Sequence, residues 1–334
     1  MTLDLPFIWA GLIAFAVLAY VVLDGFDLGI GILFPFAGDE EKRDLMMNSV
    51  APVWDGNETW LVFGGGGLFA VFPLAYAIIM PALYAPLMAM LMGLVLRGVA
   101  FEFRWRTRRG KFIWDAAFFA GSLVASLAQG LAVGALVQGI PVAGRAYAGG
   151  WWNWLTPFSL LTSLALTVGY VLLGSTWINM KTTGALQLWS RSVARIAGIA
   201  MLALIVIVSL WTPLLNNTYF HRWLSFPTIF YTAPVPLLVA FAGYRLMRSL
   251  GEELDYQPFL AALALFVLSY IGLGISFYPF IVPQSITIWQ AAAPTSSLQF
   301  LLYGASVLLP VILIYTAFSY WIFRGKLDPA GGYH

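Results

Sequence analysis

The sequence contains no cysteine and very few charged residues. Its 334 residues include 17 Lys and Arg, 15 Asp and Glu and 2 His, so that charged residues make up only 10% of the chain. Without cysteine there is no disulfide framework, no thiolate metal site and no thiol catalysis. The net charge of +2 is too small to indicate a nucleic-acid-binding protein.

Hydrophobic residues take the place of the missing charge. They make up 61% of the chain, at a mean hydropathy of +0.85, whereas globular proteins contain about half. We therefore expect an integral membrane protein. Residues 1–6 lack a basic region and the apolar run after them reaches membrane length, so we expect no cleavable signal peptide.

Nine apolar runs are long enough to form transmembrane helices, which need about 20 residues each. The fold class we expect is therefore all-α. Pro81, between the second and third runs, marks either a loop or a kink. The expected helices cover residues 7–36, 57–80, 82–103, 112–138, 154–180, 190–213, 225–248, 257–282 and 298–323.

The distribution of basic residues predicts the orientation. Fourteen Lys and Arg residues fall on one side of these spans and only two, Arg145 and Arg222, on the other, with Arg97 inside a helix. Because cytoplasmic loops carry the excess of Lys and Arg, we expect the N-terminus outside and the C-terminus in the cytoplasm of a bacterial inner (cell) membrane. The tryptophans within residues 151–154 are typical of an outer interface.

Acidic residues at membrane depth all lie in the first half of the chain. Asp24 is 17 residues beyond Phe7, or about 26 Å along a helix, and so lies toward the cytoplasmic side. We expect these acids and Arg97 to converge near the inner leaflet. They are Asp24, Asp27, Asp55 and Glu58, with Glu102 and Asp115 at the borders.

Two pairs of these acids have helical spacing. Asp24 and Asp27 are three residues apart, as are Asp55 and Glu58, so each pair shares a helix face. Acids paired in a low dielectric suit a proton relay, and ionisable groups inside membranes are usually functional. The alternative is that Asp55 N-caps its helix and Asp27 meets a loop amide. Arg97 is either a counter-ion or snorkels to the interface.

The remaining features are the four glycines 64–67 and the scarcity of metal ligands. The glycines indicate either close helix packing or space for a planar ligand or a neighbouring subunit. His221 and His334 lie in an outer loop and at the terminus, so we expect no haem or copper to be ligated by this chain. Methionines such as Met88 could bind iron weakly, but apolar packing is their commoner role.

Three motifs resemble subunit II of the cytochrome bd-type quinol oxidases: "VVLDGFDLGIGILFPF" (21–36), "MMNSVAPVWDGNETWL" (46–61) and "RGVAFEFRWR" (97–106). The resemblance is specific over the first hundred residues and rests beyond them on length, span number and aromatics. With its glutamate, the motif "DGNETW" is more similar to the sequences of the cyanide-insensitive branch of the family than to those of the better-studied branch.

The resemblance implies two four-helix bundles plus one additional helix, paired as a heterodimer with a haem-bearing subunit I. We expect residues 1–140 to form the first bundle, with the buried acids, and residues 150–334 the second, more apolar bundle and the last helix. In the family, subunit I ligates haems b and d (or b in its place). The complex oxidises quinol, ubiquinol for example, and reduces O2 to water with cytoplasmic protons. A small single-helix subunit and membrane lipid are further expected partners.

The resemblance also implies roles for individual residues. Asp24 and Asp55 match positions of a proton path along the subunit interface, with Asp55 near a haem propionate of the partner and Trp54 packed beside it. From placement alone we add further candidates. Asn57 is expected near the partner haem, and Asp27, Glu58, Arg97 and Glu102 along the proton path.

Two other functions stay open. A secondary transporter would also place polar groups on interrupted helices, but it predicts them in both halves of the chain, and the second half has no acid at membrane depth. A purely structural assembly subunit would use the acids as caps, and would tolerate Asp24→Asn without loss of turnover.

Overall fold

Polar residues fix the points at which several apolar runs become helices. The first helix, α1 (Leu5–Leu33), follows Asp4, whose carboxylate accepts a hydrogen bond from a backbone N–H of the first turn. Helix α7 (Pro157–Lys181) begins with a capping box in which the hydroxyl groups of Thr156 and Ser159 each bond the other's backbone N–H. Such caps satisfy N–H groups that have no partner within the helix.

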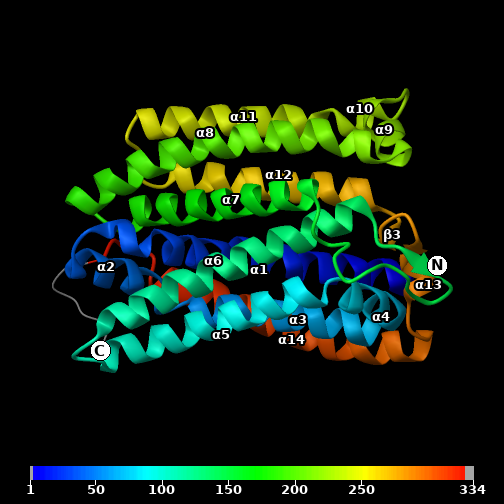
Figure 1. Ribbon diagram of the computed structural model, residues 1–334, viewed down its shortest axis with the longest axis horizontal. Coiled ribbons are helices and arrows are strands. Elements are labelled where there is room, and N and C mark those ends of the chain that lie inside the picture. Colours follow the sequence, from blue (N-terminus) through cyan, green and yellow to red (C-terminus); the bar gives the residue numbers. More distant parts are fainter. Residues whose placement is uncertain (1–2, 328–334) are drawn as a thin grey trace.

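The computed structural model describes residues 3–327, which are mostly helical (Figure 1). Two short antiparallel hairpins lie in loops: β1 (Val142–Ala143) with β2 (Ala146–Tyr147), and β3 (Phe280–Val282) with β4 (Ile286–Thr287). The other elements are η1 (Phe34–Ala37), α2 (Glu40–Val50), α3 (Trp54–Val71), α4 (Pro73–Ala82), α5 (Tyr84–Arg106), α6 (Lys111–Gln138), α8 (Gly184–Leu215), α9 (Asn217–Leu224), α10 (Ile229–Thr232), α11 (Pro234–Gly251), α12 (Gln257–Phe277), α13 (Ile288–Ala291) and α14 (Thr295–Ile322).

Eight segments in the described part of the chain are long and apolar enough to cross a membrane. The second expected span is present as two helices, α3 and the shorter apolar helix α4, with only Phe72 between them. The chain is therefore an all-α membrane protein, as the sequence predicts. One helix break lies at Phe72–Pro73, inside the second expected span. A second break lies at Leu83, two residues after Pro81, and separates the second span from the third as expected.

The long helices form two bundles and one additional helix (Figure 1). Helices α1, α3–α4, α5 and α6 make up the first bundle, and α7, α8, α11 and α12 the second, with α7 packed on both α1 and α6. The last helix, α14, returns to the first bundle and contacts α1 and α3. The C-terminal part of the chain therefore covers the half that carries the buried acids.

Glycines bring the helix backbones together where the bundles cross. A Cβ atom at Gly29 of α1 would lie 1.8 Å from the backbone oxygen of Tyr170 in α7, and one at Gly174 would meet the backbone of Gly29 at 2.6 Å. Only glycine fits at such a crossing, which is how small residues act in membrane helices.

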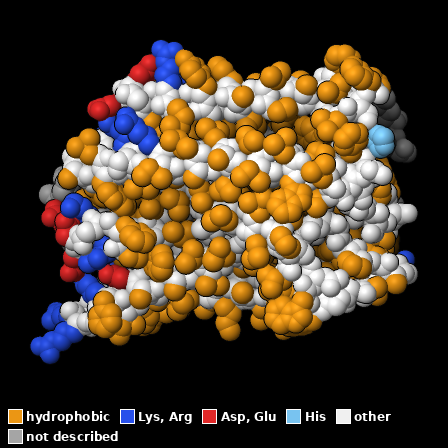
Figure 2. Space-filling model, turned by 45° about the horizontal axis from the view of Figure 1, so that its top comes forward, with side chains coloured by type: hydrophobic (Ala, Val, Ile, Leu, Met, Phe, Trp, Pro, Cys, Tyr) orange, Lys and Arg blue, Asp and Glu red, His pale blue; other side chains and the backbone are white. Residues whose placement is uncertain are grey.

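The charged side chains gather at one end of the molecule. Figure 2 shows Lys, Arg, Asp and Glu at the left end, beside a wide hydrophobic belt. Helix α2 and the α5–α6, α7–α8 and α11–α12 connections lie at this end, while α1 begins at the opposite end (Figure 1). We call these the charged end and the opposite end.

Candidate functional site: buried acids around Arg97

Arg97 of α5 is the centre of a buried ionic cluster. Only 2% of its side chain is exposed, and its two terminal nitrogens bind acids of two other helices. Nη1 donates to Oδ1 of Asp24 in α1 at 2.6 Å, and Nη2 donates to Oε2 of Glu58 in α3 at 2.9 Å. The prediction that Arg97 is a counter-ion is confirmed, and the snorkelling interpretation is wrong because the guanidinium points into the bundle.

Asp27 belongs to the same cluster but binds an amide instead of a cation. Its Oδ2 accepts a hydrogen bond of 2.8 Å from Nδ2 of Asn57, which also donates to the backbone oxygen of Leu23 at 3.2 Å. The hydroxyl group of Tyr320 in α14 donates to Oδ1 of Asn57 at 2.8 Å. The partner of Asp27 is thus a side chain of α3 and not the loop amide of the alternative interpretation.

The cluster contains three carboxyl groups and one guanidinium. If all three acids were ionised, their three negative charges would face a single positive charge. Oδ2 of Asp24, Oδ1 of Asp27 and Nε of Arg97 are buried and have no hydrogen-bond partner among residues 3–327. Because an uncompensated buried charge is very costly, this arrangement favours keeping at least one carboxyl group protonated.

The acids form a gradient of exposure from the surface inward. Asp55 is exposed at the start of α3, the side chain of Glu58 is 29% exposed, and that of Asp24 is fully buried. The N-cap of α3 is Val53, with no side-chain cap. The alternative that Asp55 N-caps this helix is therefore wrong, and its carboxylate is free to face the surroundings.

The glycines of α3 face two ways. A Cβ atom at Gly64 would meet Val17 at 3.3 Å and one at Gly67 would meet Ile13 at 3.2 Å, so these two glycines pack on α1. Gly65 and Gly66 have nothing within 4 Å. The run therefore packs one side of α3 against α1 and leaves the backbone of the other side uncovered within this chain.

Two other predicted site residues lie apart from the cluster. Trp54 stacks on Phe101 with ring centroids 4.9 Å apart, and its ring covers Gly98. Glu102 is exposed and has no ion-pair partner among residues 3–327. Asn57, in contrast, belongs to the cluster, because its amide group donates to Asp27, and its expected place near the partner's haem stays a prediction.

The sequence analysis missed a chain of neutral polar groups in the bundle interior. Tyr170 of α7 donates to Oε1 of Gln129 in α6 at 2.6 Å, and Nε2 of Gln129 donates to the hydroxyl oxygen of Tyr20 at 2.8 Å. Tyr20 lies one helical turn before Asp24 on α1. A buried glutamine inside an apolar run is the signal that could have revealed this chain.

A second ionic cluster ties α2 to the first bundle at the charged end. Arg104 of α5 is fully buried and donates at 2.6 Å both to Asp44 of α2 and to Asp115 of α6. At the rim of this end, a hydrogen bond from Lys111 lowers the pKa of Glu40 from its ordinary value. This cluster uses its charges to join three helices.

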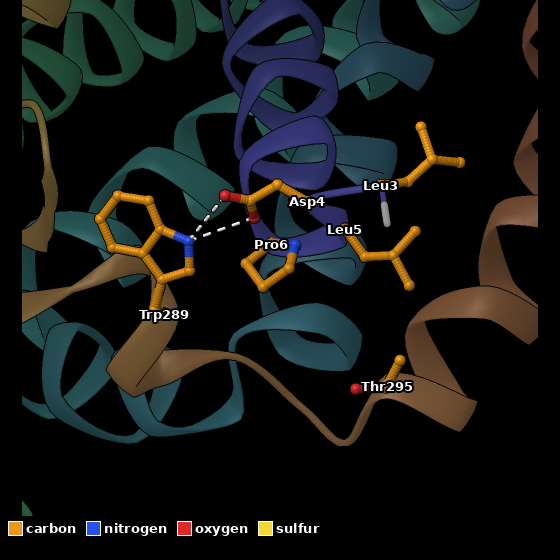
Figure 3. A pocket seen from close by; sticks show the side chains of 6 residues that line it. All are labelled: Leu3, Asp4, Leu5, Pro6, Trp289 and Thr295. Atoms are coloured by element: carbon orange, nitrogen blue, oxygen red, sulfur yellow. Dashed lines mark hydrogen bonds between the residues drawn. The ribbon is translucent and has the colours of Figure 1, made fainter. Parts of the chain in front are cut away.

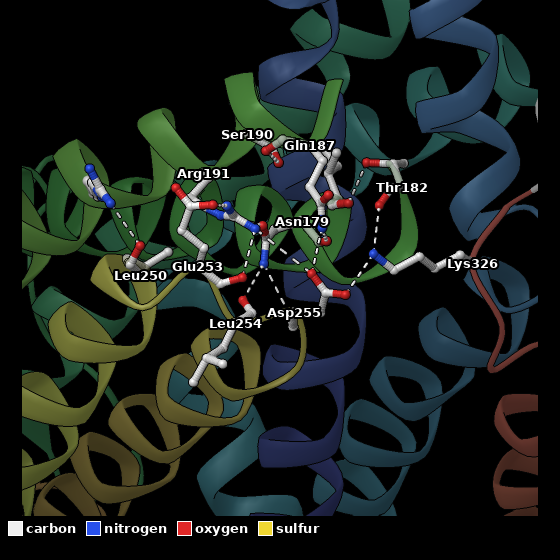
Figure 4. A network of polar contacts seen from close by, with 12 residues as sticks. Asn179, Thr182, Gln187, Ser190, Arg191, Leu250, Glu253, Leu254, Asp255 and Lys326 are labelled. Atoms are coloured by element: carbon white, nitrogen blue, oxygen red, sulfur yellow. Dashed lines mark hydrogen bonds and ion pairs between the residues drawn. The ribbon is translucent and has the colours of Figure 1, made fainter. Parts of the chain in front are cut away.

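A third polar network lies at the charged end of the second bundle (Figure 4). Nδ2 of the buried Asn179 donates to the backbone oxygens of Leu254 and Asp255, both at 3.1 Å. Lys326, beyond α14, forms an ion pair of 2.7 Å with Asp255, and the backbone N–H of Leu327 donates to the oxygen of Lys181 at 2.8 Å. These contacts fasten the segment after α14 to α7 and to the α11–α12 loop.

A hollow lined by Asp4 and Trp289 does not contain this chemistry. It has a volume of about 390 Å³ and lies at the opposite end, beside the start of α1 (Figure 3). Its one acid, Asp4, already accepts hydrogen bonds of 3.1 and 3.0 Å from Nε1 of Trp289. We therefore assign the site by the buried charges and not by the size of the cavity.

One of the two histidines of the chain lies among the described residues. His221 was expected in a loop but is an exposed residue of helix α9, with its Nδ1 atom 3.0 Å from the hydroxyl oxygen of Ser225, and His334 lies outside the described residues. Within residues 3–327, no group of three or more His, Cys, Asp or Glu side chains could hold a metal ion.

Fold and site together define a class: a multi-pass helical membrane protein with buried acids around one arginine. A family model, cytochrome bd terminal oxidase subunit II, matches residues 5–323. The chain belongs to this family and is a subunit of a quinol-oxidising, oxygen-reducing complex.

Relatives and a solved structure agree with this assignment. The chain is 31% identical to cytochrome bd-I ubiquinol oxidase subunit 2 of Escherichia coli K12, over 97% of this chain and 95% of that protein. It is 28% identical to cytochrome bd ubiquinol oxidase subunit 2 of Bacillus subtilis, over 96% of each. The fold matches a chain of the bd oxidase from Geobacillus thermodenitrificans with a TM-score of 0.77 at 16% identity, over 97% of this chain and 100% of that one.

Proposed function

We propose that the cluster of Asp24, Glu58 and Arg97 takes up protons from the cytoplasm for oxygen reduction in the neighbouring subunit. The observation that carries this proposal is the excess of carboxyl groups over cations at a buried site, next to the exposed Asp55. A buried site with more acids than cations can hold a proton, because ionising every acid there would leave negative charge without compensation.

The exposure of each acid sets its place in the proton path that we propose. Asp55 receives a proton from water at the charged end, and Glu58, one turn further along α3, is the next acceptor. Arg97 holds one oxygen each of Glu58 and Asp24, which leaves Oδ2 of Asp24 free to accept a proton. Asp27 offers a further acceptor, at its Oδ1 atom.

The cofactors and partners follow from the family and from the ligands that this chain lacks. We infer that haems b and d (or b in its place) are ligated by subunit I, because the single described histidine does not fit. When bound there, they would carry electrons from quinol and supply the oxygen-binding site. Gly65 and Gly66 offer a surface on which that subunit can approach α3 closely. A small single-helix subunit and membrane lipid are the further partners we propose.

The orientation is part of the proposal. The charged end carries the basic loops, so we place it in the cytoplasm and the start of α1 outside. Asp55 and Glu58 then face the side from which protons are taken up.

The test is oxygen consumption with a short-chain quinol by the purified complex, with wild type compared to Asp24→Asn and Asp55→Asn. We expect turnover to fall roughly a hundredfold or more, as for loss of a proton-transfer group, while haem spectra stay normal. Asp4→Asn is the matched control, because Asp4 lies at the opposite end. Unchanged turnover, or turnover that falls only in proportion to haem content, would make the chain a structural assembly subunit.

A further inference from the structure

A small cavity lies between the start of α3 and the last turns of α14. Its volume is about 20 Å³, enough for one water molecule, which needs at least about 10–15 Å³ and two to four polar partners. Five of its eight lining residues carry polar side chains. The lining is Pro52, Val53, Gly56, Asn57, Tyr315, Thr316, Ser319 and Tyr320.

This cavity lies near the charged end of the molecule. Pro52 and Val53 immediately precede α3, which begins at that end, and Ser319 is three residues from the end of α14. Three residues of helix span about 4.5 Å. Water at the charged end is therefore the nearest solvent to the cavity.

Asn57 separates the cavity from Asp27. The side chain of Asn57 is 1% exposed, lines the cavity and donates to Oδ2 of Asp27. Asp27 is 2% exposed, and within residues 3–327 its Oδ1 has no hydrogen-bond partner and no cation forms an ion pair with it. Tyr320, also in the lining, holds Asn57 in place through its hydroxyl group.

The cavity is on a different side of α3 from the Glu58–Arg97 ion pair. Asn57 and Glu58 are consecutive, so their side chains point about 100° apart around the helix. Glu58 reaches Arg97 of α5, whereas Asn57 reaches Asp27 of α1 and Tyr320 of α14. Helix α3 thus divides the polar groups into an α5 side and an α14 side.

We propose that the cavity between α3 and α14 is a water site that gives protons a second route, to Asp27, with Asn57 as its gate. The inference deepens the proposed function and rests on it. An amide neither takes up nor releases a proton at neutral pH, so a proton passes only when Asn57 turns away and water reaches Asp27. The proton then moves from water to a lone pair of Oδ1, and the water regains a proton from solvent at the charged end.

The experiment follows the protonated carboxyl group of Asp27 by infrared spectroscopy of the purified complex. The C=O band that is lost in Asp27→Asn is assigned to this residue, and its shift after transfer to D2O gives the rate of proton exchange. We expect Ser319→Leu, which fills the cavity, to slow this exchange at least tenfold. Thr316→Val, which keeps the volume but removes one polar partner, should also slow it.

Two controls separate this route from the one through Asp55. Ala317→Leu changes an exposed residue next to the cavity lining and should leave the exchange rate unchanged. Asp55→Asn should lower turnover but leave the exchange of Asp27 unchanged. If turnover stayed intact in Asp24→Asn and Asp55→Asn, the proposed function would be wrong. The exchange rates of Asp27 would still show whether water reaches this residue through the cavity. No protonated band of Asp27, or equal exchange rates in wild type, Ser319→Leu and Thr316→Val, would overturn the inference.

Discussion

Arg97 holds two acids from different helices, of which Asp24 is fully buried and Glu58 is partly exposed. Its guanidinium joins α5 to Asp24 of α1 and Glu58 of α3, with donor–acceptor distances of 2.6 and 2.9 Å. An arginine suits this role because its planar group keeps its charge and presents several donors in fixed directions. The cost of removing it falls on the acids that remain buried.

Replacing Arg97 tests whether the stability of the protein depends on the charge that this residue places beside the buried acids. We expect Arg97→Gln to lower the free energy of unfolding by about 3–5 kcal/mol, the usual cost of breaking a buried ion pair from one side. The double variant Arg97→Gln with Asp24→Asn should recover part of this loss, because the most buried charge is then gone. Thermal unfolding of the purified complex, monitored by fluorescence, measures both. A double variant no more stable than the single one would contradict the pairing.

Gly29 is a residue whose importance is purely steric. We expect Gly29→Ala to destabilise the protein by about 1–3 kcal/mol or more, as overpacking does, because the new methyl group would lie 1.8 Å from the backbone oxygen of Tyr170. Gly11→Ala on the same helix is the matched control, since nothing lies within 4 Å of its Cβ position. The melting temperatures of the two variants measure this difference. Equal values would rule out the close crossing of α1 and α7 at Gly29.

At the scale of elements, apolar length predicts most of the fold. A helix of about 20 apolar residues has few alternatives in a bilayer, so eight spans follow directly from the sequence. Pro81 correctly marks the boundary between the second and third spans, because α4 ends at Ala82 and α5 begins at Tyr84. The break at Phe72–Pro73, inside the second span, was not expected, although Pro73 also lacks an N–H group. Helix α2 was missed because its sequence, polar at first, has no membrane-length apolar run.

The candidate site was predictable in composition but not in pairing. Acid spacing and depth pointed to Asp24, Asp27, Glu58 and Arg97, since charges inside a membrane are rare and expensive. Which acid binds Arg97 depends on how α1, α3 and α5 rotate against one another. The contribution of Tyr320 depends on the return of α14 to the first bundle. Neither is encoded in local spacing.

Arg104 is the contact that holds α2 on the bundle. We expect Arg104→Gln to increase amide hydrogen exchange across α2, because the ion pairs to Asp44 and Asp115 are lost together. Arg106→Gln on the same helix, at an exposed position, should leave the exchange of α2 as in wild type. Hydrogen exchange read by mass spectrometry compares the two. Equal protection of α2 in both variants would show that its apolar contacts suffice.

At the scale of the whole molecule, charge and hydrophobicity are separated along the direction of the helices. Lys and Arg gather at one end, and the hydrophobic belt covers the middle (Figure 2). The polar network of Asn179 and Asp255 shows that the second bundle is not purely apolar, and that its polar groups lie at the same charged end. This asymmetry is what the positive-inside rule requires of a cytoplasmic surface.

The orientation is testable with reporters fused after the last residue. We expect a fluorescent protein that folds only in the cytoplasm to be bright there, and alkaline phosphatase, which is active only outside, to be inactive. The same reporters placed in the loop after α6, near Arg145, should give the opposite result. Phosphatase activity at the C-terminal fusion would invert the orientation and place Asp55 on the wrong side for proton uptake from the cytoplasm.

The attachment of the segment after α14 has a consequence for the order of events during synthesis. Lys326 reaches Asp255, and Tyr320 reaches Asn57, from α14 and the segment after it, which are synthesised after all the other described helices. Every other helix can insert before these contacts exist. The contact of α14 with Asn57 therefore forms after the other described helices have been made, so that a chain truncated before α14 carries its buried acids without that cover.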